Sequence, residues 1–177
     1  MKKYTHFEIS DMLDSMVILY DTREQPTPRM KRRLKRFPCK SVRKKLDFGD
    51  YSLMYTAPNG EEVDCSQLVA VERKMNLDEL CMCFGKGRGR FEREFIRAAQ
   101  NGAKIHLLIE NADYEMLFGG DYRSLLSPNA LIASYLAWSE RYNIQLHFCK
   151  EETTPILIYK ILYYWLKNHL EKIEESG

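Results

Sequence analysis

An apolar run meets a cluster of charges in the stretch Leu68-Val69-Ala70-Val71-Glu72-Arg73-Lys74-Met75-Asn76-Leu77-Asp78. The run is typical of a buried strand, and on a strand residues i and i+2 point to the same face. Glu72 and Lys74 are therefore presented side by side at a strand end. Such a pairing suits metal-assisted phosphodiester hydrolysis, because the carboxylate can hold a hard divalent cation and the lysine can position water or offset phosphate charge. An ordinary surface ion pair is the alternative.

A second carboxylate is expected across a β-hairpin from Glu72. The dipeptide Asn59-Gly60 is a strong hairpin signal between two strand-like segments. A tight turn at this point places Asp47 opposite Glu72, whereas extra residues before the return strand place Asp50 there. We favour Asp50 because Gly49 beside it permits a close backbone approach. Asp47 remains the alternative.

Length and composition indicate one globular domain inside the cell. The chain has 177 residues, of which 45% are hydrophobic and 29% are charged. The odd number of cysteines fits a reducing compartment, and the N-terminus lacks the apolar segment of a signal peptide. The most apolar stretch, 155–170, is interrupted by lysines and is short for a bilayer span. We therefore expect an intracellular, cytoplasmic protein without a membrane partner, associated with the nucleoid if its source is bacterial or phage.

Strands alternate with helices along the chain, which predicts an α/β domain. The expected strands are 16–20, 51–56, 68–73, 105–109 and 144–148, with 42–48 as a weaker candidate. The expected helices are 28–37, 77–83, 90–100, 113–118, 128–141 and about 155–174, with a flexible, basic, glycine-rich loop at 84–89.

Two further segments predict contacts. Ten basic residues and no acid occur between Arg29 and Lys45. Such a run is often only a solvated face, but it also suits sequence-independent contact with a phosphate backbone.

The last helix, 155–174, is apolar on nearly every face, so it must be covered on more than one side. Burial within its own domain is one solution, and we predict the other, a homodimer seam.

Taken together, these motifs resemble the nuclease domain of the XPF family of structure-specific DNA endonucleases. The family pattern Gly-Asp, then Glu-Arg-Lys-x-x-x-Asp, is matched by Gly49-Asp50 and by residues 72–78. The upstream element Asp-x-Arg-Glu is matched by Asp21-Thr22-Arg23-Glu24, and a downstream Arg90-Phe91 opens a helix as in the family. The match extends from about residue 17 to 150.

The resemblance implies a restriction-endonuclease-like, PD-(D/E)xK fold, with a central mixed sheet flanked by helices. It implies a single nuclease domain over 1–177, with its core at about 16–150. It also implies cleavage of DNA near branches, flaps or junctions, dependent on Mg²⁺ or Mn²⁺, in repair, recombination or replication. Asp50 and Glu72 would be metal ligands, and Asp21 a further ligand or a supporting carboxylate. Lys74 would orient water or stabilise the pentacovalent phosphate, and Arg73 would support the site or contact the scissile phosphate.

Other motif residues divide into DNA contacts and structural positions. Asp78 is explained by a role in the first turn of a helix, and Glu24 by an ion pair with Arg23 or a basic neighbour. His106 and His147 lie in predicted strands and receive no catalytic role. The candidate DNA contacts are Arg23, Arg32, Arg33, Arg36, Lys86, Arg88 and Arg90.

One departure from the family concerns substrate choice. Many members append a tandem helix-hairpin-helix domain, and nothing after residue 150 has its paired hairpin glycines. We therefore expect a stand-alone form whose substrate choice depends on the basic run, a symmetric partner or another protein. A non-catalytic DNA-binding or scaffolding subunit is the main alternative, and a sequence-specific or RNA nuclease is a third. The presence of Asp50, Glu72 and Lys74 favours the enzyme.

Overall fold

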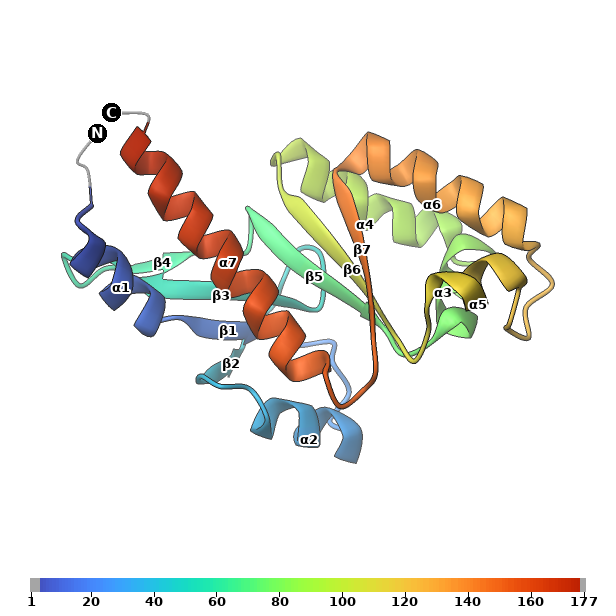
Figure 1. The fold of residues 1–177 in the computed structure, drawn as a ribbon, viewed down its shortest axis with the longest axis horizontal. Helices are drawn as coiled ribbons and strands as arrows, with labels where there is room; N and C mark the ends of the chain where they lie inside the picture. The colour runs from blue at the N-terminus through green and yellow to red at the C-terminus, as the bar shows by residue number, and fades with distance from the viewer. Residues whose placement is uncertain (1–3, 176–177) are drawn as a thin grey trace.

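A computed structural model describes residues 4–175 of the chain (Figure 1). The ends of the predicted single domain, 1–3 and 176–177, lie outside the described residues. The strands are β1 (Val17–Tyr20), β2 (Ser41–Arg43), β3 (Tyr51–Thr56), β4 (Glu62–Asp64), β5 (Val69–Lys74), β6 (Lys104–Glu110) and β7 (Ile144–Cys149). The helices are α1 (His6–Asp14), α2 (Pro28–Lys35), α3 (Leu77–Phe84), α4 (Arg88–Gln100), α5 (Tyr114–Gly119), α6 (Pro128–Tyr142) and α7 (Thr154–Glu175).

All seven strands form one mixed sheet, which confirms the predicted α/β class. Six follow the order β2-β1-β3-β5-β6-β7, and β4 pairs with β3 beside this path. The pairs β1–β2, β5–β6 and β6–β7 are parallel, whereas β3 runs antiparallel to β1, β4 and β5. Strands β5 and β6, which carry the candidate site, are therefore central and buried, as their apolar sequences predict.

Helices cover both faces of the sheet (Figure 1). On one face α3, α4 and α6 pack on the apolar side chains of β6 that include Ile105, Leu107 and Ile109. On the other face α7 packs on β3 and β5, in the apolar cluster that includes Val71 and Leu108, and α1 packs on α7 and β3. The strand period of two thus assigns consecutive residues of β5 and β6 to opposite layers.

The hairpin register confirms the placement of Asp50 beside Glu72. Tyr51 pairs with Val71, and the Asp50 amide donates to the Val71 carbonyl at 2.9 Å. Gly49 has φ +71°, and a Cβ there would lie 2.6 Å from the Ala70 Cβ, so only glycine fits. The return strand is divided, because β4 closes the hairpin and the turn at 65–68 precedes β5.

Several local expectations were wrong or incomplete. Helix α1 and strand β4 were not predicted, although the capping box of Thr5 and Glu8 marks the start of α1. The weak strand 42–48 is only β2, because the chain then turns so that the Leu46 amide donates to the Asp21 carboxylate. The expected loop at 84–89 is shorter, since α4 already begins at Arg88.

Helix α7 is covered on one side by its own domain. Ile158, Leu162, Leu166 and Leu170 recur every four residues and are fully buried against the sheet. On other sides, Ile156 and Tyr164 stay 41% and 53% exposed. Burial within the domain therefore accounts for part of the apolar sequence, and the homodimer seam stays a prediction. Across residues 4–175, no helix combines the length and apolar character that a bilayer span requires.

Candidate active site

Three motif side chains converge where β5 ends. Asp50, Glu72 and Lys74 line a cleft of about 910 Å³, whose other walls come from α3, α4 and the segment 124–126. Glu72 and Lys74 point to the α4 face because they lie two apart on β5, as predicted. Asp50 is partly exposed in this cleft, whereas Glu72 and Lys74 are buried at its inner wall.

Glu72 is a buried carboxyl group with one cationic partner. It is 5% exposed, and its Oε1 accepts a hydrogen bond from Lys74 Nζ at 2.5 Å. Burial raises the pKa of Glu72 to about 8, and the charge of Asp50 adds to this shift while Lys74 opposes it. The carboxylates of Asp50 and Glu72 repel each other when both are charged. The same arrangement is favourable for a bound cation.

Lys74 stays charged in this environment. Burial lowers its pKa, but the charges of Glu72 and Asp50 outweigh burial, so that the net shift is upward. The ammonium also lies 4.9 Å from the ring centroid of Phe91, a cation–π contact from α4. The site therefore holds a fixed positive charge beside its two carboxylates.

Asp50 is held by the strand opposite it. Its Oδ2 accepts from the Arg73 backbone N–H at 2.8 Å, and its other carboxylate oxygen has no hydrogen bond in the described structure. Asp50 is partly exposed in the cleft, unlike Glu72. The pair thus offers a cation one accessible carboxylate and one buried carboxylate.

Asp21 lies nearby but faces other partners. Its Oδ1 accepts from the Arg23 backbone N and Nε, both at 2.7 Å, and its Oδ2 accepts from the Leu46 amide at 2.7 Å. Arg23 then reaches Glu94 of α4 at 3.1 Å. Both oxygens of Asp21 are therefore engaged, an arrangement that fits a supporting carboxylate better than a metal ligand, and either role stays a prediction.

The donor set fits a hard divalent cation. Within the described residues, no three His, Cys, Asp or Glu side chains are arranged to hold a metal ion. Asp50 and Glu72 nevertheless supply carboxylate oxygens from adjoining strands. Mg²⁺ is typically bound by one or two carboxylates and completes its shell with water and substrate phosphate. Two protein carboxylates in an open cleft are therefore sufficient for such an ion.

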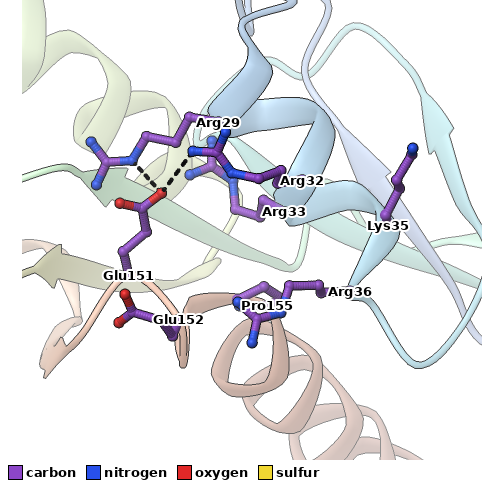
Figure 2. A pocket seen from close by; sticks show the side chains of 8 residues that line it. All are labelled: Arg29, Arg32, Arg33, Lys35, Arg36, Glu151, Glu152 and Pro155. Carbon is purple, nitrogen blue, oxygen red and sulfur yellow. Dashed lines mark ion pairs between the residues drawn. The ribbon is translucent and has the colours of Figure 1, made fainter.

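The predicted basic face on α2 is only partly available (Figure 2). Arg33 is 5% exposed and pairs with Glu24 and Glu110 at 3.6 and 3.4 Å, so it faces inward rather than toward a ligand. Arg32 and Arg36 are exposed beside a groove of about 400 Å³ between α2 and the start of α7. The charge run thus contains both surface residues and inward-facing ones.

The remaining predicted residues occupy different places. Lys86 and Arg90 are exposed and line the cleft, whereas Arg88 donates to Ser134 Oγ at 2.9 Å and lies over Trp138. Asp78 lies in the first turn of α3 and its Oδ1 accepts from the Arg123 amide at 2.7 Å. These contacts give Asp78 and Arg88 packing partners within the domain.

Glu24 lies on the far side of β5 from the cleft lining. Burial raises its pKa, with a further contribution from Asp50, whereas Arg33 and Arg73 oppose the shift. Glu24 lies 3.6 Å from Arg33, while Arg23 pairs with Asp21, so the structure gives Glu24 an ion pair with a basic neighbour and its role stays a prediction.

Sequence reasoning missed two glutamates. Glu94 lines the cleft from α4 and pairs with Arg23. Glu110 ends β6 and is fully buried among arginines. The only sequence signal for Glu110 is an acid placed directly after the apolar run 105–109, where a buried strand would end.

Comparison with known proteins agrees with this geometry. The model of the ERCC4 domain matches residues 20–161. The chain belongs to the ERCC4 domain family. The predicted resemblance to the XPF family is thereby confirmed, and the match includes each of the elements 21–24, 49–50 and 72–78.

Solved structures show the same fold. XPF from Aeropyrum pernix superimposes with a TM-score of 0.58 at 22% identity, covering 82% of this chain and 59% of that chain. XPF from Aeropyrum pernix in complex with DNA gives a TM-score of 0.55 at 21% identity, covering 86% and 66%. The predicted restriction-endonuclease-like fold is confirmed. This chain therefore spans about three fifths to two thirds of the length of those proteins. Comparison with curated proteins gives no match.

Proposed function

We propose that this protein is a divalent-metal-dependent DNA endonuclease that hydrolyses phosphodiester bonds near branches, flaps or junctions, in repair, recombination or replication. The observation that carries the proposal is the convergence of Asp50, Glu72 and Lys74 on one open cleft. The ERCC4 domain match and the likeness to an XPF solved with DNA support nucleic acid as the ligand.

Asp50 and Glu72 would hold Mg²⁺ or Mn²⁺, because both offer hard oxygen ligands and a bound cation would offset the burial and the nearby Asp50 charge that raise the pKa of Glu72. The bound ion supplies Lewis-acid polarisation of the phosphoryl group and lowers the pKa of water. Lys74, kept protonated by its two anionic neighbours, would orient water or offset charge on the phosphate. Asp21 would support this arrangement through Arg23.

Binding of the duplex would use the cationic groups that remain accessible. Arg23, Lys86 and Arg90 line the cleft and can contact phosphates beside the scissile bond. Arg32 on α2 and Arg36, which caps the C-terminus of α2, are exposed and can contact a second arm of a branched substrate. Such contacts are independent of sequence and weaken with salt.

The proposal is tested with end-labelled flap, fork, nicked, Holliday-junction and plain duplex DNA, in Mg²⁺ or Mn²⁺. Glu72→Ala and Lys74→Ala proteins are compared with Glu62→Gln, a carboxylate change on exposed β4 outside the cleft. We expect metal-dependent cutting of branched DNA by the wild type and the control, and none by the two site variants.

A different pattern would assign another function. Binding of branched DNA without cleavage in either metal would favour the non-catalytic or scaffolding subunit. Equal cutting of plain duplex and branched DNA would remove the structure specificity from the proposal. Cutting that survives Glu72→Ala would show that the reaction is not performed in this cleft.

We also propose that α7 contributes to a homodimer seam. Its exposed Ile156 and Tyr164 are apolar side chains on a helix that already buries its opposite face. Light scattering during size-exclusion chromatography should give twice the monomer mass, and Tyr164→Glu should shift the protein toward monomer. A strict monomer at all concentrations would refute the seam.

A further inference from the structure

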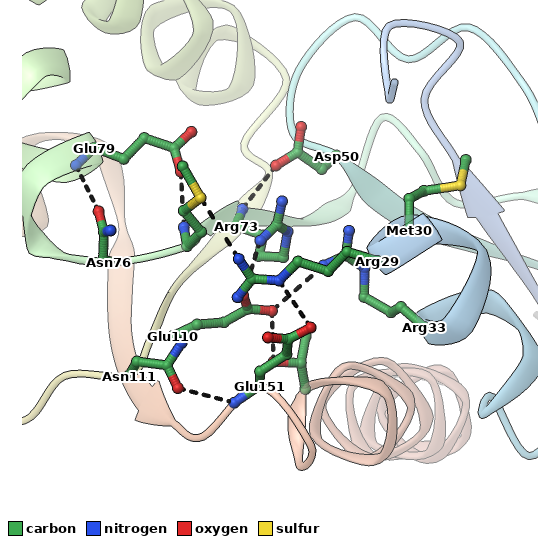
Figure 3. A network of polar contacts seen from close by, with 12 residues as sticks. Arg29, Met30, Arg33, Asp50, Arg73, Asn76, Glu79, Glu110, Asn111 and Glu151 are labelled. Carbon is green, nitrogen blue, oxygen red and sulfur yellow. Dashed lines mark hydrogen bonds and ion pairs between the residues drawn. The ribbon is translucent and has the colours of Figure 1, made fainter. Parts of the chain in front are cut away.

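Glu110 is the most densely contacted acid at the catalytic end of the sheet (Figure 3). It is 0% exposed, at the last position of β6. Its Oε2 accepts from Arg29 Nη2 at 2.8 Å and from Arg73 Nη1 at 3.0 Å. Its Oε1 accepts from Thr154 Oγ1 at 2.8 Å and from Arg33 Nη1 at 3.4 Å. A buried anion with four donors has its full hydrogen-bonding capacity engaged.

These donors come from separate parts of the fold. Arg29 and Arg33 belong to α2, Arg73 belongs to β5, and Thr154 begins α7. Arg73 and Glu110 share a face because Val71 and Leu108, two residues earlier on each strand, lie in the same apolar cluster. This face is opposite to the cleft that Glu72 and Lys74 line. Among these contacts, the one with Arg73 leads most directly to the cleft, because Arg73 lies between Glu72 and Lys74 in sequence; Arg33 also donates to Tyr51 Oη, at 2.8 Å.

Arg73 joins the two faces through its backbone. Its guanidinium forms an ion pair with Glu110, while its backbone N–H donates to the Oδ2 of Asp50 at 2.8 Å. It also lies between Glu72 and Lys74 in sequence, so its peptide units determine where those two side chains begin. Catalytic groups must be held within about 0.5 Å of a productive geometry, which requires support of this kind.

We infer that Glu110 is a positioning residue for the reaction, acting through Arg73 on the Asp50 carboxylate. The inference deepens the proposed function and rests on it. Of the two roles expected for Arg73, support of the site or contact with the scissile phosphate, the geometry favours support. The Arg73 side chain is only 14% exposed, and the cleft-lining residues do not include it. Its charge is already balanced by Glu110 and, at 3.9 Å, by Glu24.

The test compares Glu110→Gln with Thr154→Val. Glutamine keeps the shape of the side chain and removes the charge that holds Arg73. Valine removes the hydrogen bond to Oε1 and the contact of Thr154 Oγ1 with Cys149 Sγ, and it leaves the Arg73 contact at Oε2 intact. The Thr154 variant therefore controls for loss of stability in the same cluster without a change at Arg73.

Three measurements separate positioning from folding. The first is hydrogen exchange of the Arg73 amide in metal-free protein, which we expect to accelerate at least tenfold in Glu110→Gln. The second is Mn²⁺ affinity by electron paramagnetic resonance, which should weaken about 10- to 100-fold, as for other residues that orient metal ligands. The third is kcat for branched DNA, which should fall more than KM rises. Thr154→Val should stay within about twofold of wild type in each.

Glu110→Asp should restore part of the Mn²⁺ affinity, because it restores the charge. Should Glu110→Gln not fold, Arg73→Met removes the same contact at a less buried side chain and should reproduce the weaker Mn²⁺ binding. The inference is overturned if Glu110→Gln leaves amide exchange and Mn²⁺ affinity unchanged, or if Thr154→Val alters them equally. Amide exchange needs no cleavage, so this arm stands even if the wild type proves inactive.

Discussion

Glu72 and Glu110 are buried glutamates on neighbouring strands, and they differ in almost everything except burial. Glu72 is 5% exposed and Glu110 is 0% exposed. Glu72 faces a solvent-open cleft with Lys74 as its one cation and Asp50 as a nearby anion. Glu110 faces the closed opposite side of the sheet among three arginines and a threonine.

The difference shows that buried acids at the same end of a sheet can have two different roles. Glu110 has its charge offset by fixed cations, which makes it a rigid anchor. The single cation beside Glu72 does not fully offset the cost of burying its charge, so its pKa is raised. An incoming cation would offset the remaining cost. The charge of Glu110 is balanced within the fold, whereas that of Glu72 would be balanced by the proposed cation.

The largest effect is expected for Glu72→Gln in catalysis. Loss of the ligand should lower cleavage by at least about a thousandfold, a typical consequence of removing a central electrostatic group. The folded protein should lose less stability than it does in Glu110→Gln, because burial already disfavours the charged form of Glu72 and glutamine has its shape. Cleavage rates and urea unfolding would check both. A large loss of stability would remove the contrast with Glu110.

The next largest effect is expected for Glu110→Gln in stability. Removing one partner from a buried charge cluster leaves the others uncompensated, which typically costs about 3–5 kcal/mol. Here Arg29, Arg33 and Arg73 would lose the negative charge that they share. Urea unfolding at pH 7 measures the change. An effect as small as that of Glu72→Gln would show that the two acids are not distinguished by their cations.

A pH series in the metal-dependent reaction sharpens the comparison further. Protons compete with metal for Glu72, whose pKa burial raises from its ordinary value to about 8. As the pH increases toward about 8, the apparent metal affinity should rise by up to about tenfold per pH unit. Above that pH the affinity should depend little on pH. Lys74 stays protonated over this range because its pKa is raised. Mn²⁺ titrations from pH 6 to 9 would test this, and a flat profile would contradict it.

A further effect, on stability in acid, is expected from the buried ring of His106. Burial lowers the pKa of His106 to about 3, and the neighbouring His147 and Lys104 add to the shift. Since the folded pKa lies below the ordinary value, the neutral ring contributes stability that is complete above about pH 6.5 and declines as pH falls toward 3. The slope is about 1.4 kcal/mol per pH unit. His106→Asn should remove that part of the acid sensitivity in urea unfolding, whereas an unchanged slope would assign it to other groups.

The sequence predicted those features that depend on local order. The alternation along β5 places Glu72 beside Lys74, and the glycine that a close approach demands identifies Asp50 rather than Asp47. It could not predict which members of the basic run turn inward. Arg33 resembles its neighbours in the sequence, and only its inward ion pairs with Glu24 and Glu110 distinguish it. Sequence reasoning missed Glu110 for the same reason, because the residues that contact it are distant in the chain.

The cluster around Glu110 also has a consequence for how the protein is made. Arg29 is 81 residues from Glu110, and Thr154 lies a further 44 residues along. Chains emerge from the ribosome N-terminus first. The anchor of the catalytic strand is therefore complete only when the start of α7 has been synthesised. A nascent or truncated chain can carry the entire Glu-Arg-Lys motif and still lack the support that holds Asp50 in place, so assembly of the active site is deferred until the sheet is closed.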